Sequence, residues 1–151
     1  PFAGVSQVTS ACPACLRAAT ASHDLAHQRS TPSEQQCHFL AILAPTTCVN
    51  HGYAYSGWLL GYILLGNALY KADPEAYAAV LATLPETVRT DLRDNNAYWA
   101  QFQDGAARKA SNKVYEGFLK SYGEERGLQS YGTVVDMLVV YYRDVAARAL
   151  Q

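Results

Sequence analysis

The sequence predicts an all-α protein: a single domain folded as a bundle of five to six helices. Apolar residues recur at steps of three and four positions over most of the chain, which is the period of an amphipathic helix. Three of the six prolines follow a cysteine, threonine or aspartate, a pattern typical of helix starts. No stretch shows the strict alternation of a half-buried strand, and 151 residues suffice for one domain with a hydrophobic core.

The N-terminal part is expected to be an irregular lead-in followed by a Cys/His-rich helical hairpin. Cys12 and Pro13 suit the cap and the first position of a helix. Thr31 with Glu34 forms a capping-box pattern for a second helix. The expected order is a lead-in over 1–11, a helix over 13–29, a second helix that ends before Pro45, and a loop over 45–52, so that 12–51 forms the hairpin.

The remainder is expected to be one charge-poor helix followed by amphipathic helices over 73–151. Residues 53–70 contain no charged side chain and are apolar almost all round, which is typical of a helix buried in a protein core or a membrane. Asp73 and Pro74 mark the next helix start. Farther on, the apolar pattern predicts a long helical stretch over 85–122 and a last helix over 128–149.

All four cysteines and all four histidines lie within residues 12–51. The even number of cysteines predicts two disulfides that staple the N-terminal half, with Cys12 and Cys15 each paired to Cys37 or Cys48. Disulfides persist in oxidising compartments. The expected location is therefore secreted, periplasmic, or the lumen or intermembrane space of an organelle. A redox role for the CxxC at 12–15 is disfavoured because no strand or βαβ unit surrounds it.

An alternative interpretation of the same cluster is a structural zinc site. His23 and His27 lie four residues apart, so they share one face of a helix and could both bind a metal. The pattern is similar to the HExxH of zinc proteases, with Asp24 in place of the glutamate. Cys37 or His38 could complete a site with mixed nitrogen and sulfur ligands.

A docking surface is predicted on the charge-poor helix. Only four of the 25 charged residues lie in 1–70, so this half is either the inside of the domain or a face that meets something other than water. Gly57 and Gly61 form a GxxxG pattern, which permits close approach of another helix. The residues expected to contact a partner or a membrane are Tyr55, Gly57, Trp58, Gly61, Tyr62 and Leu65.

These observations predict a non-enzymatic interaction protein or accessory subunit without a cofactor. It would dock its charge-poor, Gly/aromatic-rich surface onto a partner protein or onto a membrane. The alternatives are the zinc-binding protein, with zinc as cofactor, and a carrier of a lipid or another small molecule. A formal net charge of −1 gives no basic face for nucleic acid.

Overall fold

The computed structural model describes residues 12–101 and 131–149, and every regular element in these ranges is a helix. In chain order they are the short 3-10 helix η1 (Ala14–Leu16), α1 (Arg17–Gln28), α2 (Glu34–Thr46), α3 (His51–Ala72), α4 (Pro74–Thr83), α5 (Glu86–Ala100) and α7 (Tyr131–Ala149). The predicted all-α class is therefore confirmed over the described part of the chain. The predicted lead-in, the end of the long stretch at 85–122 and the start of the last helix lie outside it.

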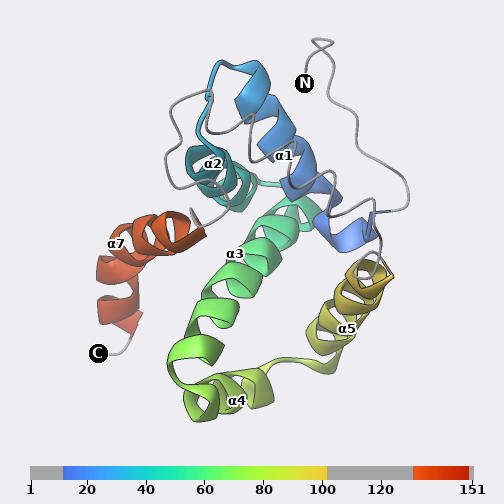
Figure 1. Ribbon diagram of the computed structural model, residues 1–151, viewed down its shortest axis with the longest axis vertical. Coiled ribbons are helices and arrows are strands. Elements are labelled where there is room, and N and C mark those ends of the chain that lie inside the picture. The colour runs from blue at the N-terminus through green and yellow to red at the C-terminus, as the bar shows by residue number, and fades with distance from the viewer. Residues whose placement is uncertain (1–11, 102–130, 150–151) are drawn as a thin grey trace.

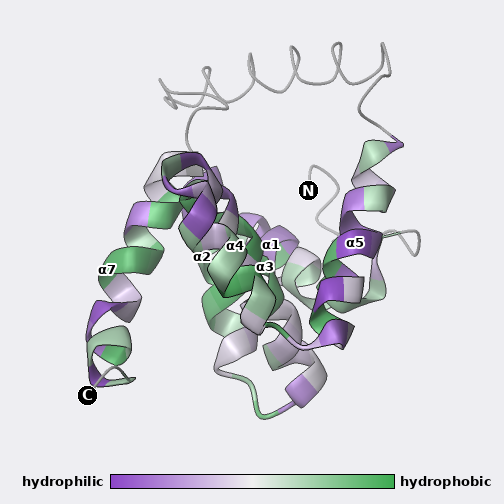
Figure 2. Ribbon diagram, turned by 90° about the horizontal axis from the view of Figure 1, so that it is seen from below, coloured by the Kyte–Doolittle hydropathy of each residue, from purple (hydrophilic) through white to green (hydrophobic). Residues whose placement is uncertain are grey.

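Helix α3 is the element around which the others are arranged (Figure 1). Both α1 and α2 pack against it and against each other, and α4 folds back at its C-terminal end. Helix α5 returns toward η1 on one side, while α7 lies against α2 and α3 on the other. In the hydropathy colouring of Figure 2, α3 lies among the other helices and is largely apolar, whereas much of α5 is hydrophilic. The charge-poor segment is therefore the central helix of the fold.

Two buried clusters form the core, and α3 contributes to both. One joins Cys12, Leu16 and Leu59, with Val88 and Leu92 of α5 packed against it. The other joins Ile42 of α2 to Val134 and Leu138 of α7, with Leu64 and Leu65 of α3 against it. Because these contacts link helices far apart in sequence, burial of their apolar surface is what holds α5 and α7 to α3.

Close packing of α2 on α3 depends on glycine. A Cβ placed on Gly57 would lie 2.8 Å from the carbonyl oxygen of Ile42 and 3.0 Å from Cβ of Pro45. On Gly61 it would lie 3.4 Å from Cγ2 of Ile42, an ordinary contact. The GxxxG of α3 thus receives a helix of the same chain. In the described ranges no helix, α3 included, combines the length and the apolar character needed to cross a bilayer.

Several helix boundaries differ from the expected ones. The Asp73 carboxylate accepts hydrogen bonds from the backbone N–H groups of Glu75 and Ala76, so it caps α4 as predicted. Ser33 and not Thr31 precedes α2, however, and Asn50 caps α3 two residues earlier than expected. Helix α2 also continues through Pro45 to its end at Thr46, because a proline in the last turn removes only one late hydrogen bond.

The predicted disulfides are wrong: Cys12, Cys15, Cys37 and Cys48 are all free thiols. Cys12 lies in the core cluster beside α3, whereas Cys37 is buried on α2, with its sulfur 3.2 Å from the carbonyl oxygen of Thr31. Cys48 is exposed just after α2. The hairpin is held by helix packing and not by cross-links, so the argument for an oxidising compartment loses its support.

Candidate metal centre

Helix α1 brings His23 and His27 onto one face, turned toward α2. Their ring centroids lie 4.8 Å apart in an edge-to-face arrangement. Both side chains are mostly shielded from solvent, at 18% and 16% exposure. Two imidazoles one helical turn apart are a frequent way to supply two ligands to one ion.

The end of α1 determines how the chain reaches α2. The N–H of Ser30 bonds to the carbonyl of His27, and the N–H of Thr31 bonds to the carbonyl of Ala26, which is the Schellman pattern. Ser30 sits at φ 66°, in the left-handed region that normally favours glycine. This turn brings the Thr31 carbonyl oxygen to 3.1 Å from Nδ1 of His27. Because a carbonyl only accepts, Nδ1 of His27 carries the proton and donates it.

Glu34, in the first turn of α2, lies between the two histidines. Its Oε2 is 3.1 Å from Nε2 of His23, and its Oε1 is 3.0 Å from Nε2 of His27. The glutamate side chain is only 14% exposed. Since Nδ1 of His27 already carries a proton, a neutral His27 would turn a lone pair toward the carboxylate. The short distance from Nε2 to Oε1 is favourable when a shared proton or a metal ion lies between the two atoms.

His38 adds a third imidazole one turn further along α2. Its Nε2 lies 3.9 Å from Oε2 of Glu34, and its ring centroid lies 4.5 Å from that of His23. Burial lowers the pKa of His38 to about 4, and the neighbouring His23 adds to the effect. The imidazole is therefore neutral at physiological pH, which is the form that binds a metal.

Cys37 lies behind the histidines. Its sulfur is 3.4 Å from Nδ1 of His27, on the opposite side of the ring from Glu34, and its S–H donates to the Thr31 carbonyl. Burial, with the nearby Glu34 charge, raises the pKa of this thiol to about 12. Cys37 thus supports the orientation of His27 and stays protonated.

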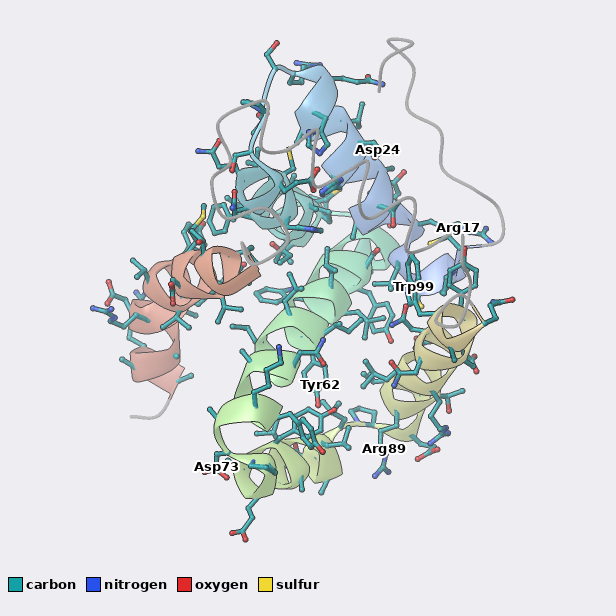
Figure 3. All side chains as sticks on the ribbon, in the orientation of Figure 1. Arg17, Asp24, Tyr62, Asp73, Arg89 and Trp99 are labelled. Carbon is teal, nitrogen blue, oxygen red and sulfur yellow. The ribbon has the colours of Figure 1, made fainter. Side chains whose placement is uncertain are left out.

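Asp24 directly follows His23 on α1, where Figure 3 labels it. Its Oδ1 lies 3.8 Å from Nδ1 of His23, and its side chain is 29% exposed. Asp24 therefore lies beside the ring nitrogen of His23 that is turned away from Glu34.

The structure brings together His23, His27 and His38 of the predicted zinc site and places Cys37 behind them. The sequence analysis missed Glu34, which it interpreted only as part of a helix cap. The spacing held a signal, because Glu34 precedes His38 by four residues and therefore shares its helical face. In the described ranges His23, Glu34 and His38 form the group whose potential ligand atoms all lie within 4.8 Å of one another.

The predicted docking residues of α3 lie mostly in internal contacts. Gly57 and Gly61 are buried against α2, and Leu65 packs on the second core cluster. The Tyr55 hydroxyl donates to Asp91 of α5, and Tyr62 points from α3 toward α4 and α5 (Figure 3). Trp58 differs, because 51% of it is exposed. Its indole packs on the ring of Tyr142, with centroids 5.4 Å apart.

Three comparisons with known proteins bear on the identity of the chain. Neither the curated proteins nor the solved structures include a match. A protein-family model matches residues 1–139, which is well over half of the 151 residues and contains the whole histidine–glutamate cluster. The chain therefore belongs to the family described as "Protein of unknown function (DUF3810)".

Proposed function

We propose that this protein is a zinc-dependent hydrolase whose metal is bound by His23, His27 and Glu34. The observation that carries the proposal is the contact of Glu34 with Nε2 of both α1 histidines, at 3.1 and 3.0 Å. With Nδ1 of His27 donating to the Thr31 carbonyl, the lone pair of Nε2 faces Glu34 and is available to a metal ion. A backbone acceptor behind a ligating histidine is the usual device that orients it.

The distances suit zinc. Ligand atoms about 2.1 Å from a tetrahedral ion lie about 3.4 Å from one another. The two Glu34 contacts are close to this value, but His27 lies outside the group whose ligand atoms are all within 4.8 Å of one another, so its ring must approach the others when the ion binds. Two imidazoles and one carboxylate form the donor set of several zinc hydrolases, in which the remaining position takes water. The contrast with Mg²⁺ and Ca²⁺ is clear, because those ions favour oxygen ligands throughout.

Asp24 is the proposed general base. Bound zinc lowers the pKa of a water ligand to about 7. A carboxylate directly after the first histidine can take the proton of that water, as in the HExxH pattern. The Asp24 carboxylate lies 3.8 Å from Nδ1 of His23, so its side chain must rotate toward the Nε2 side to do this. Asp24 is one methylene shorter than the glutamate of the HExxH pattern. We therefore expect slow hydrolysis of amide or ester bonds, since the carboxylate reaches the water less closely.

Metal analysis tests the zinc site. Chelator-treated protein reloaded with zinc should retain about one ion per chain after desalting. Glu34→Gln keeps the shape of the side chain and removes its charge, and it should weaken zinc binding at least tenfold. His51→Ala is the matched control, because His51 is exposed at the start of α3, away from the cluster. If reloaded wild type retains no zinc, the proposal is wrong.

Activity is tested on a library of fluorogenic peptides. Zinc-loaded wild type should cleave some members, and Asp24→Asn should lose this activity while it binds zinc as wild type does. Loss of turnover with unchanged zinc content is the result expected for a general base and not for a metal ligand. Equal turnover by wild type and Asp24→Asn would remove Asp24 from the mechanism.

A second candidate function is docking onto a protein partner. The half-exposed Trp58 packs on Tyr142 of α7, whose neighbours Val139 and Val140 are 51% and 63% exposed. Exposed aromatic and aliphatic side chains grouped in this way are typical of interaction surfaces. Trp58→Ser should then abolish self-association or partner capture, measured by sedimentation and by cross-linking. A wild-type chain that sediments as a monomer and captures no partner would count against this function.

A further inference from the structure

His38 occupies a position that the three-ligand site does not explain. It lies one turn after Glu34 on α2, so both side chains project from the same face of that helix. Its Nε2 is 3.9 Å from Oε2 of Glu34, the same oxygen that contacts Nε2 of His23. The potential ligand atoms of His23, Glu34 and His38 all lie within 4.8 Å of one another. This mutual proximity is the spacing expected of side chains that share one ion.

We propose that His38 is a fourth protein ligand of the metal, which rests on the zinc site proposed above. Three imidazoles and one carboxylate then surround the ion, and His27, which lies outside the 4.8 Å group, approaches it on binding. The side chain is 20% exposed, which leaves the ring partly accessible from solvent. The reactive water enters as a fifth ligand, a coordination that zinc adopts in hydrolytic sites. The resting protein therefore holds its zinc tightly and turns over slowly.

The remaining groups around His38 agree with this assignment. The ring of His38 lies against that of His23, with an angle of 45° between the two ring planes. The carboxylate of Glu34, which is itself proposed to bind the ion, lies 3.9 Å from Nε2 of His38.

X-ray absorption at the zinc edge is the decisive experiment, because it counts imidazole ligands. Zinc-loaded wild type should show three imidazoles, and His38→Asn should show two. Zinc affinity, measured by competition with a chromophoric chelator, should fall at least tenfold in His38→Asn and remain unchanged in His51→Asn. A loss of zinc affinity is expected both for a residue that binds zinc and for one that only orients a ligand. The number of imidazole ligands seen by X-ray absorption distinguishes these two roles for His38.

His38→Cys is a second variant that keeps the proposal testable if His38→Asn folds poorly. Its thiolate should add a sulfur neighbour about 2.3 Å from the zinc. Two imidazoles in wild-type zinc protein, or no sulfur neighbour in folded His38→Cys, would overturn the fourth ligand and leave the three-ligand site intact. Wild type that takes up no zinc would overturn the zinc site itself, so the two failures are distinguishable.

Discussion

The contact between α2 and α3 predicts opposite effects for alanine at two glycines one turn apart. At Gly57 the new methyl group would lie 2.8 Å from the Ile42 carbonyl oxygen and 3.0 Å from both Pro45 Cβ and Thr46 Cγ2. The nearest of these atoms is backbone, so α2 itself must move. At Gly61 the nearest atom is Cγ2 of Ile42 at 3.4 Å, which is ordinary contact.

The magnitudes follow from two opposing terms. Overpacking a well-filled contact costs about 1–3 kcal/mol, and three close approaches place Gly57→Ala in the upper half of that range. Alanine in a helix interior gains about 1 kcal/mol over glycine. Gly57→Ala should therefore lower the free energy of unfolding by roughly 1–2 kcal/mol. Gly61→Ala should raise it by up to about 1 kcal/mol, since only the propensity term applies.

Urea denaturation followed by far-ultraviolet circular dichroism measures both variants against wild type. In a chain of this size 1 kcal/mol corresponds to about 2–4 °C in Tm, so thermal melts should separate the two variants by several degrees. Equal midpoints for Gly57→Ala and Gly61→Ala, or a Gly57→Ala variant more stable than wild type, would refute the close packing of α2 on α3.

Three further predictions concern the ends of α1 and the histidine cluster. Ser30→Gly should raise stability by roughly 0.5–1 kcal/mol in urea melts, because glycine adopts a φ of 66° without steric cost. Ser56→Ala should lower it by about 1–3 kcal/mol, since the buried Ser56 hydroxyl accepts the Ala19 N–H at 3.0 Å. In the metal-free protein the pKa of His38 is about 4 when folded and about 6.5 when unfolded, so the unfolded state binds more protons between these values. Stability should fall as pH drops from 6.5 toward 4, and His38→Asn should flatten this slope in melts recorded across that range.

The helical character of the chain could be predicted from the sequence because helices depend on local patterns, namely the spacing of apolar residues and the residues at helix starts. The Asp73–Pro74 pair marks a cap and a first position wherever it occurs, and the structure has both. The position of the charge-poor helix could be predicted for the same reason. Its role as the central helix could not, because a helix that is apolar almost all round fits a core, a partner or a membrane equally.

The disulfides and the third ligand could not be predicted because both depend on how segments meet. An even number of cysteines does not show whether their thiols lie close enough to pair. The thiol of Cys37 lies against Thr31, whereas Cys48 is exposed. Glu34 reaches His23 and His27 only because the chain turns at Ser30 in a conformation that serine rarely adopts. Sequence spacing alone therefore places Glu34 on the helical face of His38, but it does not show that this face meets the two histidines of α1.

The shortness of the segment that carries the metal centre has a consequence for folding. His23 and His38 bound a stretch of 16 residues (38 − 23 + 1), and only residues 29–33 separate α1 from α2. Closing so short a loop costs little chain entropy, and local contacts form early. An ion bound here would cross-link two neighbouring helices before α7, more than ninety residues farther along the chain, had reached its place on α2. We expect zinc to speed the folding of the hairpin more than it slows the unfolding of the whole domain.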